Sequence, residues 1–216
     1  MPQDNQGSIS SGEAAYSALL KAISDGTLKP GDRIREIEIA KLLRLSRTPI
    51  REALRRLESD GIVEHRPRIG AVVRKLSHSE IVELYEMRLV LERTAAAMAA
   101  KHASDAEIDT LDDLNKDIAA NRNNPVAAAA INQEFHQALY RACRNRFLLD
   151  AAKVLTNSLV LLGITTFTDE ARIDIVVAQH LDVIEALRDR DAERAAKAAE
   201  THLQTSLRKR LKVINA

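Results

Sequence analysis

The sequence predicts a mainly α-helical protein, in which an N-terminal three-helix unit with a small β-hairpin precedes a six-helix antiparallel bundle. Apolar side chains recur at helical spacing in segment after segment, and strand-like runs are confined to residues 62–73. Only 3% of the residues are aromatic although 45% are hydrophobic. An alanine- and leucine-rich core of this composition is typical of packed helices.

Two short amphipathic helices are predicted first. Residues 11–25 place Leu19 and Ile23 on one apolar face, and residues 35–43 repeat the helical spacing. The pattern then stops for a few residues around Arg44 before it begins again. Two helices joined by so short a turn indicate a helix-turn-helix.

The third helix is basic on its outer face. Thr48 is predicted as its N-cap and Pro49 as part of its first turn, where a missing N–H has no cost. Arg51 and Arg55 lie opposite the apolar stripe, and Gly61 is predicted to end the helix in the left-handed conformation. A helix of this size has the dimensions to enter a DNA major groove.

A β-hairpin with a basic tip follows the third helix. Residues 62–65 and 71–73 are short strand-like runs, joined by the segment Arg66-Pro67-Arg68-Ile69-Gly70. Together, the helix, the tight turn, the basic helix and the basic hairpin predict a winged helix-turn-helix. A wing of this kind can follow the DNA backbone or probe the minor groove.

The run PGDRIREIEIAKLLRLSRTPIREALRRLESDGIVEHRPRIGAVV resembles the DNA-binding domain of the GntR family of bacterial transcription regulators. The phrases SRTPIREAL, RLESDGIV and RIGAVV carry the resemblance, which implies double-stranded DNA as a partner. It departs from the family at Arg44, where a glycine is usual, and at Ile37, where many relatives have an arginine that Arg35 or Arg44 would replace. The expected DNA-binding residues are Arg35, Arg44, Ser46, Arg47, Thr48, Arg51, Arg55, Arg66, Arg68 and Gly70.

Charge divides the chain in the same place. Residues 1–75 contain 14 Lys and Arg against 10 Asp and Glu, whereas the remaining residues contain 18 against 21. A basic unit joined to an acidic one favours a DNA-binding domain at 1–75 and a sensing domain at 76–216. The single cysteine, the polar N-terminus and the lack of a long apolar run favour a cytoplasmic protein without a membrane span.

Strand patterns are missing after residue 76, and capping and breaking signals divide the rest into six helices. Ser77-His78-Ser79-Glu80 and Ser104-Asp105-Ala106-Glu107 have the spacing of capping boxes. The predicted helices end near 102, 121, 145, 166, 189 and 214. The fourth, residues 147–166, is so apolar that we expect it at the centre of the bundle.

The phrases YEMRLVLE, NQEFHQALYRACRN, QHLDVIEALRDRD and THL resemble the FCD effector domain of the FadR-like branch of the GntR family. Six helices suggest its VanR-like subgroup. The resemblance implies a homodimer that binds a palindromic operator and a small organic acid as effector.

Three histidines fall on inward faces of three different helices, namely His136, His180 and His202. Neutral imidazoles are good ligands for a divalent metal, with Zn or Ni expected here, and Asn132 lies one turn before His136. In relatives that bind metal the position of Asn132 is an aspartate, so its amide oxygen is expected to be a weaker ligand. The alternative is that each histidine is a core residue satisfied by hydrogen bonds.

Arg88 lies among apolar residues and therefore needs an anionic partner. It is either in a structural ion pair with a buried glutamate or, as the family resemblance implies, a clamp on an effector carboxylate.

We therefore expect a regulator, most often a repressor in this family, rather than an enzyme. A metal-dependent hydrolase with an accessory DNA-binding head is the alternative, although the sequence shows no acidic residue beside the histidines that would act as a base. A constitutive architectural DNA binder is a third class, but it would leave the polar residues of the bundle unexplained.

Overall fold

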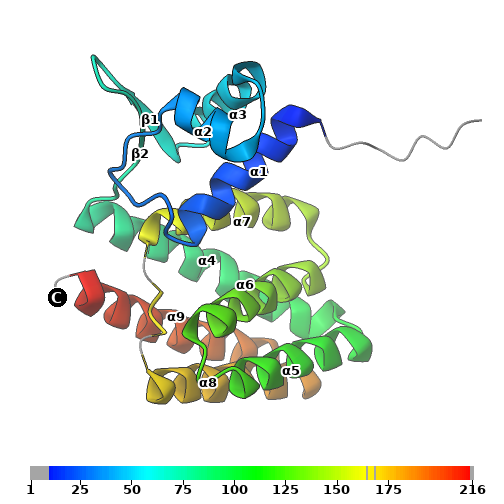
Figure 1. Ribbon diagram of the computed structural model, residues 1–216. Helices are drawn as coiled ribbons and strands as arrows, with labels where there is room; N and C mark the ends of the chain where they lie inside the picture. The colour runs from blue at the N-terminus through cyan, green and yellow to red at the C-terminus, as the bar shows by residue number, and fades with distance from the viewer. Residues whose placement is uncertain (1–9, 164, 168, 215–216) are drawn as a thin grey trace, which may run out of the picture. The chain divides into compact units, whose positions relative to one another are not determined.

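The computed structural model describes residues 10–163, 165–167 and 169–214. These residues form two compact units (Figure 1). The first contains residues 10–77 together with 156–163, and the second contains the remaining described residues. The predicted fold class is confirmed, because helices dominate and one small two-stranded sheet is present.

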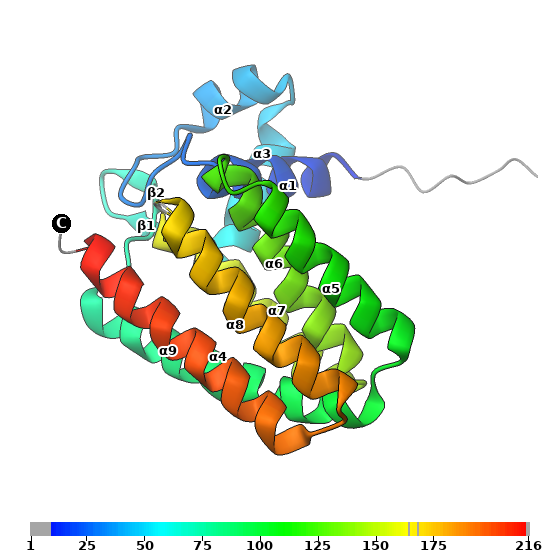
Figure 2. The same ribbon diagram turned by 90° about the horizontal axis from the view of Figure 1, so that it is seen from below.

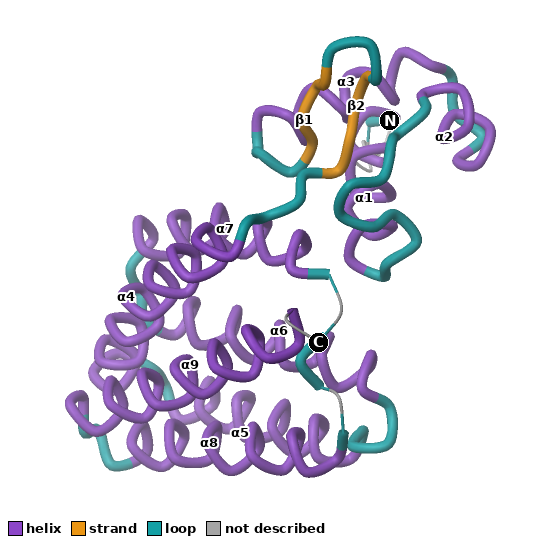
Figure 3. Tube along the Cα trace, turned by 90° about the vertical axis from the view of Figure 1, so that its left-hand side faces the viewer, coloured by secondary structure: helices purple, strands orange, loops and turns teal. Residues whose placement is uncertain are grey.

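The first unit is a winged helix-turn-helix. Its elements are α1 (Ser11–Ser24), α2 (Glu36–Leu43), α3 (Arg47–Ser59), β1 (Val63–Arg66) and β2 (Gly70–Val73). The strands pair antiparallel with Val63 opposite Val73 and Arg66 opposite Gly70, which leaves residues 67–69 as the tip of the wing (Figure 3).

The apolar faces of α1, α2 and α3 meet in one core. Leu19, Ile23, Ile50 and Leu57 are almost completely buried there. Leu161, far away in the sequence, lies in the same core as part of a short 3-10 helix, η1 (Val160–Leu162).

The turn before α3 differs in detail from the prediction. The helix begins at Arg47 and has Ser46 as its N-cap, so the assignment of Thr48 as the cap is wrong. The physical reason is the backbone, because Ser46 is extended (ψ 167°) and the next residue is already helical. Arg44 adopts the left-handed conformation (φ 53°) that a glycine would adopt more easily, and Gly61 does so at φ 68°, as expected.

The second unit is a helical bundle. Its elements are α4 (His78–His102), α5 (Asp105–Ala120), α6 (Pro125–Ala142), α7 (Arg146–Leu159), α8 (Glu170–Arg188) and α9 (Ala192–Ile214). Figure 2 shows α9 between α4 and α8, and α5 between α8 and α6. Phe135, Ile173 and Ile184 are completely buried in the main core.

The expectation that residues 147–166 form a central helix is wrong. The α-helix ends at Leu159, and Gly163 (φ 67°, ψ −132°) stops the following 3-10 turn in a conformation that only glycine adopts readily. Only Leu148 and Ala152 of α7 are buried, whereas Phe147 is 72% exposed. The apolar residues of this segment therefore serve two other purposes, an exposed face on α7 and a contribution to the core of the first unit.

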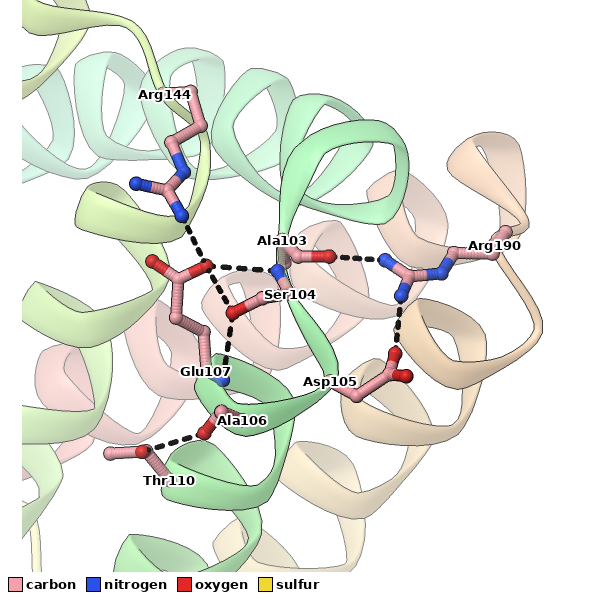
Figure 4. A network of polar contacts seen from close by, with 8 residues as sticks. All are labelled: Ala103, Ser104, Asp105, Ala106, Glu107, Thr110, Arg144 and Arg190. Carbon is pink, nitrogen blue, oxygen red and sulfur yellow. Dashed lines mark hydrogen bonds and ion pairs between the residues drawn. The ribbon is translucent and has the colours of Figure 1, made fainter.

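Polar contacts join the α4–α5 connection of the bundle to the α6–α7 and α8–α9 connections (Figure 4). Ser104 and Glu107 form the predicted capping box at the start of α5. Arg144, after α6, donates to the Glu107 carboxylate at 2.9 Å, and Arg190, between α8 and α9, bonds the Ala103 carbonyl and Asp105. Arg144 is in the left-handed conformation (φ 57°), and α6 ends at Ala142 rather than near residue 145 as predicted.

Within the described residues, no helix combines the length and the apolar character needed to cross a membrane.

Candidate DNA-binding surface and buried histidine site

The residues predicted to contact DNA, seven of which are arginines, lie on the surface of the first unit. Nine of the ten are exposed, and Gly70 is half-buried at the base of the wing; the nine are Arg35, Arg44, Ser46, Arg47, Thr48, Arg51, Arg55, Arg66 and Arg68. Arg68, at the tip of the wing, adopts the left-handed backbone conformation (φ 68°). Gly70 (φ 98°) has no atom within 4 Å of where a Cβ would be, so another molecule can approach its backbone closely.

Two arginines of α3 share one carboxylate. Arg47 and Arg51 each donate to Oε2 of Glu36, both at 2.9 Å. The bond from Arg47, supported by Arg51, holds the pKa of Glu36 below its ordinary value despite some desolvation. Because these side chains are exposed, the ion pairs are weak and their arginines can exchange partners with a phosphate or a base edge.

The three predicted histidines converge inside the bundle. His136 on α6, His180 on α8 and His202 on α9 are all buried, and one nitrogen of each lies within 4.8 Å of the others. The rings of His180 and His202 have their centroids 4.7 Å apart, and His180 stacks on Phe135 at 3.8 Å. The structure thus brings together three residues that are far apart in the sequence.

Two of the histidines have partners that orient them. Nδ1 of His136 lies 2.7 Å from Oε2 of Glu92, and Nδ1 of His202 lies 3.2 Å from Oε1 of Gln179. The Gln179 amide is oriented by its donation to Thr205 at 3.1 Å, so its oxygen accepts from His202. The Nε2 atoms of His136 and His202 are then available as ligands, and metal-binding histidines usually have such outer partners.

Other polar atoms at the site have no partner among the described residues. Both nitrogens of His180 and Oδ1 of Asn132 are buried without a hydrogen bond. Burial, and then the neighbouring charges, hold the pKa values of His180 and His202 well below the ordinary value, so both rings are neutral. Neutral imidazoles and an unbonded amide oxygen fit a divalent cation. The spread of 4.8 Å is slightly wider than the roughly 4 Å that opposite ligands of one ion span, so binding requires a small inward movement.

Sequence reasoning missed Glu92, which is 2% exposed and lies beside the histidines. Its pKa is lowered to about 2, because the attraction of His136 and Arg88 outweighs the strong effect of burial. Arg88 donates to its other oxygen at 3.0 Å, so Arg88 forms the structural ion pair that was one of its two interpretations. The spacing of Arg88 and Glu92, four residues apart on one helix, was visible in the sequence, whereas the contact with His136 depends on tertiary packing.

Comparison with known proteins places both units in one family. The FCD domain matches residues 83–205, and the bacterial regulatory proteins of the gntR family match residues 11–73. This chain is a GntR-family transcriptional regulator with an FCD domain. The family match explains why a basic winged helix-turn-helix and a helical bundle with a polar centre occur in one chain.

Several relatives of this GntR-family regulator match over most of their length. A probable D-xylose utilization operon transcriptional repressor from Paenarthrobacter nicotinovorans is 32% identical, over 88% of this chain and 84% of the relative. The Nta operon transcriptional regulator of Aminobacter aminovorans is 30% identical, over 86% and 88%. The E. coli McbR/YncC structure shares the fold, with a TM-score of 0.83 at 21% identity over 96% of this chain and 100% of that one. These relatives are regulators and not enzymes, and they lend no support to the hydrolase alternative.

Proposed function

We propose that this GntR-family regulator is a cytoplasmic repressor, and that a small organic acid, bound with a divalent metal inside the bundle, controls its affinity for a palindromic operator. The observation that carries the proposal is the buried set of His136, His180, His202 and the unpartnered Asn132 oxygen. A constitutive DNA-binding protein has no need for such a set, because unsatisfied buried polar atoms are costly.

The ligand set supports a metal that is bound by neutral groups. The three imidazoles and the Asn132 amide bring no negative charge, and Glu92 reaches the site only through His136. A bound Zn or Ni ion would supply a positive centre that attracts an anionic ligand. The residues of this chain would hold that ion, orient the rings through Glu92 and Gln179, and exclude bulk water by burial.

Exposed apolar side chains support a homodimer. Met87 and Val90 on α4 and Phe147 and Val154 on α7 are all exposed, and both helices contribute residues to one small core, which they share with Tyr140 and Cys143 at the end of α6. Large apolar side chains that remain exposed on two helices of one unit are typical of an interface. A two-fold dimer would place two α3 helices on the two halves of a palindrome.

A segment of the chain also connects the bundle to the DNA-binding unit. Residues 156–159 are the last turn of α7 and residues 160–163 follow it, yet all of them belong to the first unit. Within this segment Leu161 is 4% exposed in the core of the first unit. One helix, α7, is therefore shared by the two units, and a change in the bundle that moves residues 146–155 would be transmitted along it to the DNA-binding unit.

The first test determines metal content and its dependence on the histidines. Purified protein should contain about one divalent ion per chain by elemental analysis, and His180→Ala should lose it. Binding of both proteins to an operator, selected from a pool of random duplexes, should be similar, because α3 and its core lie in the other unit.

A second variant separates a metal ligand from a core residue. Asn132→Asp restores a carboxylate at the predicted oxygen position and should tighten metal binding. A protein that is purified without metal, and whose melting temperature does not respond to added zinc or nickel, would show that the histidines are core residues. A monomer mass near 23.9 kDa in light scattering would contradict the dimer.

A further inference from the structure

A second buried arginine in the bundle has no acidic partner. Arg172, in the first turn of α8, is only 4% exposed. Its Nη2 donates to Oγ of Ser206 at 3.0 Å, but Nε and Nη1 are buried without a partner among the described residues. Asp169 accepts from the backbone N–H of Arg172 at 2.8 Å, and the neighbouring acids Glu170 and Asp174 both pair with Arg122 at 3.0 Å.

The contrast with Arg88 shows that this is unusual within the same unit. Arg88 is also buried, but Glu92 neutralises its charge at 3.0 Å. Burial lowers the pKa of Arg172, and Tyr85 and Asp169 oppose this only in part. An uncompensated buried guanidinium costs free energy, so a protein that keeps one has a use for its free donors.

The place of Arg172 in the fold indicates what that use is. It lies eight residues before His180 on α8, and its partner Ser206 lies four residues after His202 on the antiparallel helix α9. Four helical residues correspond to about 6 Å. Ser206 therefore lies about one turn from the histidine layer. The backbone of Arg172 lies about two turns from His180, and its side chain reaches Ser206, so the guanidinium and the hydroxyl form one polar layer next to the histidines.

We propose that Arg172 and Ser206 form an oxyanion receptor for the effector, whose second polar group faces the histidines. The inference deepens the proposed function, on which it rests, and it assigns to Arg172 the role that the sequence suggested for Arg88. The guanidinium offers N–H donors in a planar fork that suits carboxylate or phosphate oxygens. A small acid with two polar groups about one helical turn apart, such as a dicarboxylate, fits this arrangement better than a monocarboxylate.

The test uses the full chain with succinate, inorganic phosphate and acetate as probes, with and without added nickel. Succinate or phosphate should raise the melting temperature of the wild type more than acetate does, and comparing the two identifies the type of oxyanion. Arg172→Met should lower the affinity for the effective probe at least tenfold in calorimetry, and Arg172→Lys should retain part of it. Arg188→Met, on the same helix but exposed and paired with Asp112, is the matched control and should respond like the wild type.

The ligand-free proteins provide a readout that a purely structural arginine would not give. If Arg172 is a receptor, Arg172→Met should melt at the same temperature as the wild type or higher, because an uncompensated charge has been removed. A variant that melts lower and keeps its response to succinate or phosphate overturns the proposal. So does a wild type that none of the probes stabilises at millimolar concentration.

Failure of the proposed function would look different. Metal content and operator binding are measured on the same variants and on His180→Ala. Suppose that the wild type and His180→Ala both lack metal, and that only Arg172→Met loses the response to the anion. The proposed metal site would then be refuted, whereas the proposed oxyanion receptor would be supported.

Discussion

Each unit of this regulator contains a glutamate shared by two basic side chains, but one cluster is exposed to water and the other is buried. In the DNA-binding unit, Arg47 and Arg51 share Glu36 on an open surface, with both arginine side chains 55% exposed. In the bundle, Arg88 and His136 share Glu92, whose side chain is 2% exposed. Water screens the first cluster, so its pairs are weak and can be exchanged for DNA. The second cluster is shielded from water, so removing one member leaves an uncompensated charge in the core.

The largest expected effect is on the buried cluster. Glu92→Ala should lower the free energy of unfolding by about 3–5 kcal/mol, because Arg88 then remains buried without a counter-charge. Urea denaturation followed by circular dichroism measures this. The double variant Arg88→Met/Glu92→Met, which removes both charges, should recover most of the loss. A loss below about 1 kcal/mol in Glu92→Ala would mean that the cluster behaves like a surface pair.

DNA binding is expected to depend on Arg51 without a comparable effect on stability. Arg51→Ala should weaken operator binding by about 1–3 kcal/mol if the arginine contacts a base with two hydrogen bonds. Its free energy of unfolding should change by no more than about 0.5 kcal/mol, as is usual at an exposed position. Fluorescence anisotropy titrations provide the affinity, and unchanged affinity would remove Arg51 from the contact set.

The wing should contribute a smaller and less sequence-dependent part of the affinity. Arg68→Ala removes one exposed charge at its tip and should weaken binding to operator and random duplexes alike. The slope of log affinity against log salt concentration should fall by about 1, because one phosphate contact is lost. A loss confined to the operator would show instead that Arg68 contacts a base.

The smallest stability change is expected for the exposed counterpart of Glu92. Glu36→Gln removes the carboxylate that Arg47 and Arg51 share, yet it should cost only about 0–1 kcal/mol of unfolding free energy. Operator affinity should stay equal or rise, because both arginines no longer have to leave a carboxylate to bind DNA. A stability loss as large as that of Glu92→Ala would remove the difference between the two regions.

Much of the fold follows from local sequence alone. Helical spacing, the capping box at Ser104 and the left-handed position of Gly61 depend on residues close together in the chain, and the structure confirms them. The first and last residues of α2 and α9 also differ little from those predicted. Errors occurred where a backbone conformation overrode composition, as at Ser46 and at Gly163, which ends the segment after α7.

The sequence by itself determined which residues face inward on each helix, and this was enough to select His136, His180 and His202. Only the tertiary structure determined which side chains contact these histidines. Glu92 contacts His136 across 44 positions of sequence, and Arg172 meets Ser206 across 34. Periodicity specifies a direction around one helix axis, whereas charge compensation depends on distances between different helices. For that reason the sequence left the role of Arg88 open, and the packing paired it with Glu92, whereas Nε and Nη1 of Arg172 have no partner among the described residues.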